Sequence, residues 1–302
     1  MISRRAFLPV PLSIAAAWVG CVDISGANPG AFVQREEKRF TVTGKPDVVL
    51  STFDGSIEVK SWDSADVSVT IERHGLSSDA AAAIEVVSSQ DGNRVSVEVK
   101  HPVSHWSWLG TGSASLVVSV PQSADVKASS GDGSIRLDRV TGTIALRSGD
   151  GRIVATNSSG NVSVATGDGS IDLDAVDGAI VATTGDGRVK VSGKLNRVQA
   201  RSGDGSIAIQ ARPGSTVEAD WEIASGDGSV TLGIPEVFDA ELDARTGDGG
   251  IRLEGVSVTS TGSIHRNSVT GRLGSGGHPV RVRTGDGSIT VRRSGSAGTN
   301  GA

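Results

Sequence analysis

The chain has 302 residues, a formal net charge of −5, 41 glycines, no tyrosine, and only five phenylalanines and five tryptophans. Glycine is about twice as frequent as its average of roughly 7 %. This composition, with many Val and Ile residues, excludes an aromatic-cored globule and a disordered tail and indicates a repeat with tight turns. The acidic charge argues against nucleic acid as a partner and against bare anionic lipid headgroups.

Residues 1–20 have the features of an export signal. Arg4 and Arg5, followed by Phe7 and Leu8, resemble the twin-arginine consensus. Residues 6–20 are mostly apolar, but this stretch is shorter than the roughly 20 residues that a membrane helix needs. We therefore predict a signal peptide at 1–20 that is cleaved on export, with Arg4 and Arg5 as its recognition residues.

The single cysteine, Cys21, follows Trp18-Val19-Gly20, a sequence similar to the lipobox of bacterial lipoproteins, although Trp18 stands where Leu is usual. A lone cysteine in an exported protein cannot form an internal disulfide. We predict that Cys21 carries a lipid and anchors the chain to the cell envelope, facing the periplasm or on the outer membrane. A chance cysteine after a cut elsewhere is the other interpretation. Residues 21–38 are predicted to form a flexible tether.

Cleavage before Cys21 would remove Arg4 and Arg5 and change the formal charge from −5 to −7. The mature chain is therefore also acidic.

Residues 122–293 contain an internal repeat. The tripeptide Gly-Asp-Gly occurs eight times, and its first five copies are eighteen residues apart. The aspartates of the eight copies are Asp132, Asp150, Asp168, Asp186, Asp204, Asp227, Asp248 and Asp286. Insertions at 211–224 and 255–279 interrupt the period. Repeats of this kind are typical of solenoids, in which each unit needs neighbours to bury its apolar face.

Each eighteen-residue unit divides into two nonads, with Gly in the fourth place and aliphatic residues in the sixth and eighth. This alternation predicts a short strand with one face buried. Two nonads then form one flattened coil, and the coils stack about 4.8 Å apart. The glycines are expected where the backbone turns with positive φ, and Asp-Gly is a favoured turn pair. We predict a disordered tail at 294–302.

Residues 39–121 differ from residues 122–293 in having no Gly-Asp-Gly repeat. Alternating apolar and polar residues predict strands at 39–43, 47–51, 56–60, 67–72, 93–100 and 115–120, and the alanines at 80–83 favour a short helix within 78–87. We predict an N-terminal β-rich cap together with the first coils, because a bare end of the solenoid would leave strand edges unpaired. The expected fold is all-β, a single-chain β-solenoid.

The order of these segments resembles the bacterial putative-adhesin family, a domain of unknown function with Gly-Asp-Gly repeats and a β-solenoid fold. The resemblance spans residues 39–293 and implies an adhesin-like role, with no catalytic residues to carry over. Its motifs are Phe40-Thr41-Val42, Gly55-Ser56-Ile57-Glu58-Val59, Ser61-Trp62-Asp63 and Val117-Val118-Ser119-Val120-Pro121, followed by the Gly-Asp-Gly cycles.

The repeat aspartates have two interpretations. Each carboxylate accepts hydrogen bonds from nearby turn amides, or the stacked carboxylates, roughly 5 Å apart, recruit a cation. The calcium-binding nonapeptide of secreted repeat toxins, which the repeat also resembles, has Asp in its sixth place. That place is apolar here, at Ile135, Ile153, Ile171 and Val189. We predict a structural role without a metal, and a calcium-stabilised β-roll is the alternative.

The other polar residues form no pattern of catalytic residues. His101 and His105 have a spacing that would suit zinc on a helix, but Pro102 argues against a helix there. No nucleophile-elbow motif occurs, and we predict no catalytic residue, metal or cofactor. Trp106 and Trp108 are candidates for binding a protein or glycan partner, and packing of their loop over the solenoid end is the other interpretation.

We therefore predict a non-enzymatic envelope lipoprotein that acts as a structural or interaction module. A polysaccharide-acting β-helix enzyme is the alternative, and it would need a distinct pair of carboxylates in a cleft.

Overall fold

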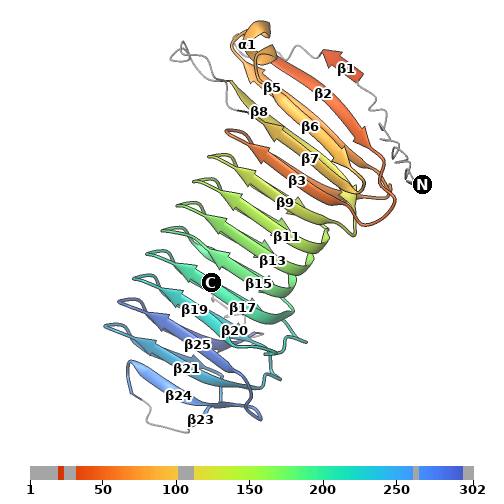
Figure 1. Cartoon of the computed structure of the whole chain (residues 1–302). Coiled ribbons are helices and arrows are strands. Elements are labelled where there is room, and N and C mark those ends of the chain that lie inside the picture. Colours follow the sequence, from red (N-terminus) through yellow and green to blue (C-terminus); the bar gives the residue numbers. More distant parts are fainter. Residues whose placement is uncertain (1–19, 24–31, 101–111, 261–264, 295–302) are drawn as a thin grey trace, which may run out of the picture.

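A computed structural model of the whole chain describes all residues except 1–19, 24–31, 101–111, 261–264 and 295–302. The described chain is an elongated stack of coils made of two sheets of 13 strands each (Figure 1). Its one described helix, α1 (Ser78–Ala82), has five residues. The predicted all-β class and solenoid architecture are confirmed.

The first sheet, called sheet A, is parallel over most of its length. Its strands are, in spatial order, β1 (Gly20–Asp23), β2 (Phe32–Phe40), β5 (Val67–Gly75), β8 (Ser113–Pro121), β4 (Ile57–Trp62), β10 (Ile135–Asp138), β12 (Ile153–Thr156), β14 (Ile171–Asp174), β16 (Val189–Gly193), β18 (Ile207–Ala211), β20 (Val230–Ile234), β26 (Ile289–Arg293) and β22 (Ile251–Glu254).

The second sheet, sheet B, faces sheet A across the core. From the opposite end, its strands are β23 (Thr259–Ser260), β24 (Ser268–Leu273), β21 (Ala240–Thr246), β25 (Pro279–Thr284), β19 (Trp221–Ser225), β17 (Leu195–Ser202), β15 (Asp177–Thr183), β13 (Ser159–Thr166), β11 (Thr141–Ser148), β9 (Asp125–Ser130), β3 (Asp47–Thr52), β7 (Arg94–Val99) and β6 (Val86–Asp91).

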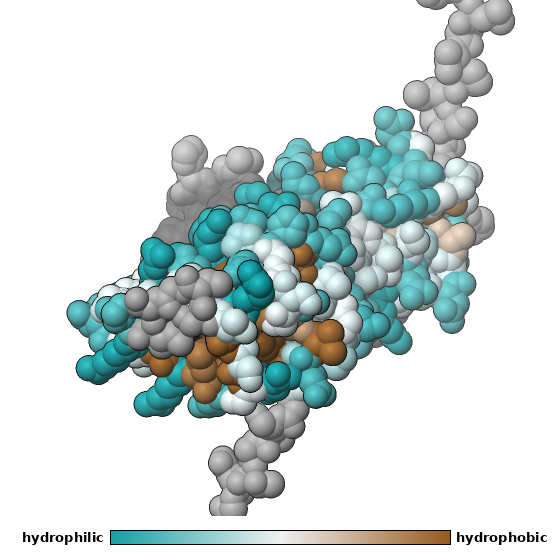
Figure 2. All heavy atoms as spheres, turned by 90° about the horizontal axis from the view of Figure 1, so that it is seen from below, coloured by the Kyte–Doolittle hydropathy of each residue, from teal (hydrophilic) through white to brown (hydrophobic). Residues whose placement is uncertain are grey.

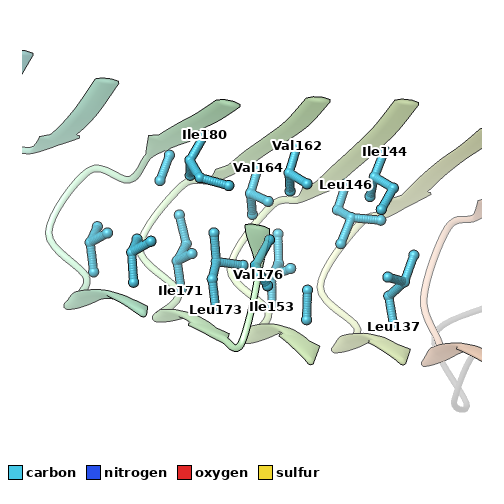
Figure 3. Packing of buried hydrophobic residues seen from close by; sticks show 14 of the residues in the cluster. Leu137, Ile144, Leu146, Ile153, Val162, Val164, Ile171, Leu173, Val176 and Ile180 are labelled. Carbon is cyan, nitrogen blue, oxygen red and sulfur yellow. The ribbon is translucent and has the colours of Figure 1, made fainter. Parts of the chain in front are cut away.

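The central coils stack in strict register. Ile135 pairs with Ile153, and Ile153 pairs with Ile171, so that partners are eighteen residues apart. In sheet B, Ile144 pairs with Val162 in the same way. Their side chains point between the sheets and form continuous apolar columns (Figure 3). Burying one such side chain stabilises the fold by about 1.5–3 kcal/mol. Because each side chain is buried by those of the coils on either side of it, the core depends on adjacent coils.

At the N-terminal end, β3 and β4 form a true coil of the stack. In sheet B β3 pairs with β9 on one side and β7 on the other, and in sheet A β4 lies between β10 and β8. The antiparallel strands β2, β5 and β6 complete this end. The predicted cap is thus present, and α1 lies within the predicted 78–87 segment, which continues into β6.

The tether prediction is wrong for Phe32–Lys38. These residues belong to β2, which pairs antiparallel with β5 over nine residues, from Phe32 opposite Gly75 to Phe40 opposite Val67. The many charged residues of β2 suggested a soluble linker, but they alternate between a solvent side and a half-buried side. The strand therefore satisfies its backbone in sheet A and buries Phe40.

At the C-terminal end the coils are stacked out of chain order. The last coil, made of β25 and β26, lies between the β19–β20 coil and the β21–β22 coil. β24 runs antiparallel to β21 on the outer side. The segment 255–279, predicted as an insertion, thus contains two strands of sheet B, β23 and β24.

The described chain stops at Ser294. This residue belonged to the predicted disordered tail, but its N–H donates to the carbonyl of Ile234 and its hydroxyl donates to the carbonyl of Ala211. Residues 295–302 lie outside the described part. Among the described residues, no helix is long and apolar enough to cross a membrane.

Candidate interaction surfaces

One long edge of the stack is formed by the Gly-Asp-Gly turns, each of which leads from a strand of sheet B to a strand of sheet A. A serine or threonine precedes every copy, and its hydroxyl holds the turn. The hydroxyl of Ser202 accepts a hydrogen bond from the N–H of Gly205 at 3.1 Å and donates to the carbonyl of Gly187, in the previous coil, at 2.9 Å. All of these hydroxyl-bearing residues are buried, namely Ser130, Ser148, Thr166, Thr184, Ser202, Ser225, Thr246 and Thr284.

The sequence analysis did not predict this row of eight buried Ser and Thr hydroxyl groups, here called the hydroxyl column. The signal was available, since Ser or Thr occupies the position before Gly-Asp-Gly in all eight copies. Hydroxyl groups commonly hydrogen-bond turn amides, but the prediction gave that role to the aspartates.

The turn glycines are required by close stacking and not by positive φ. The central turn glycines are absent from the residues with positive φ, which include Gly142, Gly160 and Gly178 of the other half-repeat. A Cβ on Gly151 would lie 2.1 Å from the carbonyl oxygen of Gly133 in the previous coil. The N–H of Gly185 also donates to the carbonyl of Gly167, which continues the ladder through the turn. The expectation of positive φ at these turns is therefore wrong.

The eight aspartates of the turns are exposed and form a ridge along this edge, here called the acidic ridge. Their spatial order differs from their chain order, because Gly285 stacks on Gly226 and Gly247 stacks on Gly285. Asp286 thus lies between Asp227 and Asp248. No hydrogen bond to these eight carboxylates occurs among the described residues, so the turn amides are held by Ser and Thr instead.

The geometry differs from that of a calcium roll. Ile135, Ile153, Ile171 and Val189 occupy the place of the repeat-toxin ligand, and their side chains are at most 1 % exposed. In the described part of the chain, no three His, Cys, Asp or Glu side chains gather in a way that could hold a metal ion.

A shallow hollow of about 410 Å³ lies on the outer face of sheet A, over β4, β10 and β12. Charges of opposite sign face each other across it, since Arg136 pairs in register with Glu58 and Asp138 with Lys60. Such cross-strand pairs stabilise neighbouring strands. The lining residues are Glu58, Val59, Lys60, Arg136, Leu137, Asp138, Arg139, Val154 and Thr156.

Asp138 is the most constrained acid of this hollow. Burial alone would raise its pKa, but hydrogen bonds from Asn157 and Thr156 and the charge of Arg139 outweigh burial and lower the pKa. Thr156 donates to this carboxylate at 2.7 Å and Asn157 at 3.0 Å. Asp138 is therefore a fixed anion, suited to a hydrogen-bonding surface and unsuited to general-acid catalysis near neutral pH.

The remaining residues singled out from the sequence are only partly placed. Cys21 lies in β1, opposite Glu36 of β2. Arg4, Arg5, Trp106 and Trp108 lie outside the described residues. The structure thus brings the eight aspartates together and leaves the export, lipidation and tryptophan predictions untested.

Comparison with known proteins gives a family but no established activity. No curated protein matches the chain. Similar solved structures include a putative cell adhesion protein from Clostridium sporogenes, with 13% identity, coverage of 86% of this chain and 100% of that chain, and a TM-score of 0.30. A putative adhesin from Bacteroides fragilis has 12% identity, coverage of 86% and 97%, and a TM-score of 0.38.

A putative lipid binding protein from Parabacteroides distasonis has 14% identity, coverage of 85% and 96%, and a TM-score of 0.40. At these values the likenesses carry no argument about function. The family model described as Toastrack DUF4097 matches residues 47–292, from the first coil to the last. The chain belongs to the Toastrack DUF4097 family.

Proposed function

We propose that this protein is a non-enzymatic, adhesin-like lipoprotein of the cell envelope whose solenoid presents a rigid surface to a protein or glycan partner. The observation that carries the proposal is the acidic ridge, in which eight exposed carboxylates project from turns fixed to one another by backbone and hydroxyl hydrogen bonds. A regular array on a rigid support loses little conformational entropy on binding. All eight aspartates lie in the same kind of turn, whereas a catalytic pair of carboxylates would have to differ from the others in its surroundings.

The envelope location rests on residues 1–21. Arg4 and Arg5 supply the export signal and Cys21 the attachment point, so the solenoid is held at a membrane by lipid. Metabolic labelling with a fatty acid tests this directly. The wild-type chain should incorporate label and remain in the membrane fraction, whereas Cys21→Ser should lose the label and appear in the soluble exported fraction. Label retained by Cys21→Ser would contradict the proposed anchor.

Partner binding is tested on panels of glycans and envelope proteins with two variants. Asp150→Asn, Asp168→Asn and Asp186→Asn, combined in one chain, remove charge from the middle of the acidic ridge without removing a hydrogen bond found in the described structure. Trp106→Ala with Trp108→Ala removes the two indoles of the segment 101–111, which lies outside the described residues.

Loss of binding in the ridge variant would place the partner on the turns, and loss in the tryptophan variant would place it at Trp106 and Trp108. Glu58→Gln, on the outer face of sheet A, also removes a carboxylate that makes no hydrogen bond in the described structure, and it is the matched control. Absence of any ligand for the wild-type chain would contradict an interaction module.

The hollow over β4, β10 and β12 is the feature that favours the enzymatic alternative, because it places the acids Glu58 and Asp138 on one face. A polysaccharide-acting enzyme should turn over at least one member of a glycan panel, and Asp138→Asn should abolish that turnover. We expect no turnover, since hydrogen bonding lowers the pKa of Asp138 and a general acid for glycoside cleavage needs a raised one.

A further inference from the structure

Asp-Gly steps are prone to spontaneous rearrangement, because a glycine has no side chain to hinder the attack of its nitrogen on the aspartate carboxyl. The chain has eleven of them, the eight copies of the repeat together with Asp54-Gly55, Asp91-Gly92 and Asp177-Gly178. Ten of the eleven aspartates are exposed, in keeping with the many hydrophilic residues at the surface in Figure 2. Exposure of the aspartate therefore does not distinguish one step from another, and the surroundings of the glycine decide.

In the repeat, the glycine that follows each aspartate is held in place. Six of these glycines donate their N–H to the hydroxyl of the Ser or Thr that precedes the copy, namely Gly133, Gly151, Gly187, Gly205, Gly228 and Gly249. The other two, Gly169 and Gly287, are buried, and a Cβ on them would lie 2.2 Å and 2.3 Å from a carbonyl oxygen of the adjacent coil. The glycine nitrogen therefore cannot approach the carboxyl carbon unless the turn opens.

Outside the repeat, two of the three steps are also held. Gly55 is buried, and a Cβ there would lie 2.1 Å from the carbonyl oxygen of Ala114. The N–H of Gly178 donates to the carbonyl of Lys194 at 2.8 Å. In ten of the eleven steps the glycine is thus hydrogen-bonded or packed against another strand.

Asp91-Gly92 differs from the other ten steps. It lies at the turn between β6 and β7, where Asp91 pairs with Arg94, and Gly92 and Asn93 connect the two strands. Gly92 is exposed with a φ of +57°, and a Cβ there would have nothing within 4 Å. Neither the N–H of Gly92 nor the carboxylate of Asp91 forms a hydrogen bond with a described residue. The nitrogen and the carboxyl carbon of this step are therefore free to meet.

We propose that Asp91 is a modification site, at which the chain converts to isoaspartate through a succinimide while the ten other Asp-Gly steps of the folded chain stay intact. The Gly92 nitrogen attacks Cγ of Asp91 and loses its proton to solvent, and one carboxyl oxygen leaves as water. Water then opens the five-membered ring at the main-chain carbonyl of Asp91, which leaves the backbone running through Cβ and Cγ. The net change is an isomerisation that needs no oxidant or reductant.

The modification acts on the N-terminal cap, because the same turn holds the entry to the first coil. Asn93 accepts a hydrogen bond at Oδ1 from the N–H of Thr43 at 3.0 Å. Its carbonyl accepts another from the N–H of Asp47, the first residue of β3, at 3.0 Å. One extra methylene in the backbone at Asp91 displaces Asn93 from these partners and so loosens the cap.

The test is ageing of the full chain, purified with Cys21→Ser so that no lipid contributes, at neutral pH in water enriched in the heavy oxygen isotope. Each passage through the succinimide adds one heavy oxygen, and chromatography separates isoaspartyl peptides from aspartyl peptides. The Asp91 peptide should gain isoaspartate more than about tenfold faster than any repeat peptide, since the repeat turns must first open. Equal rates in the Asp91 and Asp168 peptides, or no isoaspartate at Asp91, would overturn the proposal.

The same chain in urea is the matched control. Unfolding removes the turns, so all eleven steps should then isomerise at similar rates, and rates that stay unequal would assign the selectivity to local sequence and overturn the role of the fold. Asp91→Glu keeps the charge but would need a six-membered ring, and its peptide should stay unmodified. The melting temperature of the wild-type sequence should fall on ageing and that of Asp91→Glu should not. An unchanged melting temperature of the modified wild-type sequence would overturn the effect on the cap.

Discussion

Replacing Thr184 by Val removes one hydroxyl from the buried column beneath the Gly-Asp-Gly turns while keeping the shape of the side chain. The Thr184 hydroxyl donates to the carbonyl of Gly169 at 2.9 Å and accepts from the N–H of Gly187 at 3.3 Å. The side chain of Thr184 is 4% exposed, so water cannot replace it freely. Each buried polar group left without a partner costs about 1–3 kcal/mol. We expect the free energy of unfolding to fall by about 2–4 kcal/mol.

Urea unfolding followed by far-ultraviolet circular dichroism measures this change, and the neighbouring residue supplies the control. Thr183 is exposed and its side chain makes no hydrogen bond among the described residues, so Thr183→Val should change stability by less than about 0.5 kcal/mol. Thr184→Ser keeps the hydroxyl and should cost only about 1 kcal/mol for the lost methyl group. Equal effects of Thr184→Val and Thr183→Val would refute the assignment of the turn to the hydroxyl column.

Three further predictions concern the same architecture. Gly151→Ala should destabilise the fold by about 1–3 kcal/mol, because its Cβ would meet the Gly133 carbonyl at 2.1 Å. Gly250→Ala, whose Cβ would have Arg266 Nε at an ordinary contact distance of 4.0 Å, should be nearly neutral in the same urea titration. The melting temperature should be the same in calcium and in chelator, because the ligand positions of a calcium roll are buried aliphatic residues, and a rise of many degrees with calcium would contradict this. Burial alone would raise the pKa of Glu36, but Arg73 and Lys38 outweigh it and lower the pKa below its ordinary 4.5. The stabilisation that ionised Glu36 provides is therefore complete above that value and is lost as pH falls through the folded-state pKa. Glu36→Gln should flatten the acid branch of a plot of unfolding free energy against pH. An unchanged acid branch would count against the role of this ion pair.

The regular part of the fold was predictable because its signal is repeated. Ile135, Ile153 and Ile171 recur every eighteen residues, and alternation within each nonad allows only one face to be buried. The hydrogen bonds and close contacts of the turns were harder to predict, because glycine and aspartate both have strong turn preferences of their own. Only the stacked coils show that Gly151 is needed because the Gly133 carbonyl lies beside it, and that the hydrogen bonds come from Ser148.

The N-terminal strand β2 was missed for a different reason. Its sequence, with five charged residues among nine, matches a linker by composition, and its partner β5 lies about 30 residues further along the chain. Local sequence cannot reveal that Glu36 is neutralised by Arg73 inside the cap. Half-buried charge becomes compatible with a strand only when its partner is supplied by tertiary structure.

The spatial order of the last coils could not be predicted from the spacing of the repeats. Every Gly-Asp-Gly copy offers the same ladder groups, so the coil of Asp286 fits equally well on the coil of Asp227 or beyond that of Asp248. The choice is made by β24, which pairs antiparallel with the outer edge of β21 and leaves β25 only the inner edge, between β21 and β19. The same arrangement leaves β22 as the end of sheet A, because β24 extends sheet B alone. The insertion that hid the repeat period therefore also decides which strand ends each sheet.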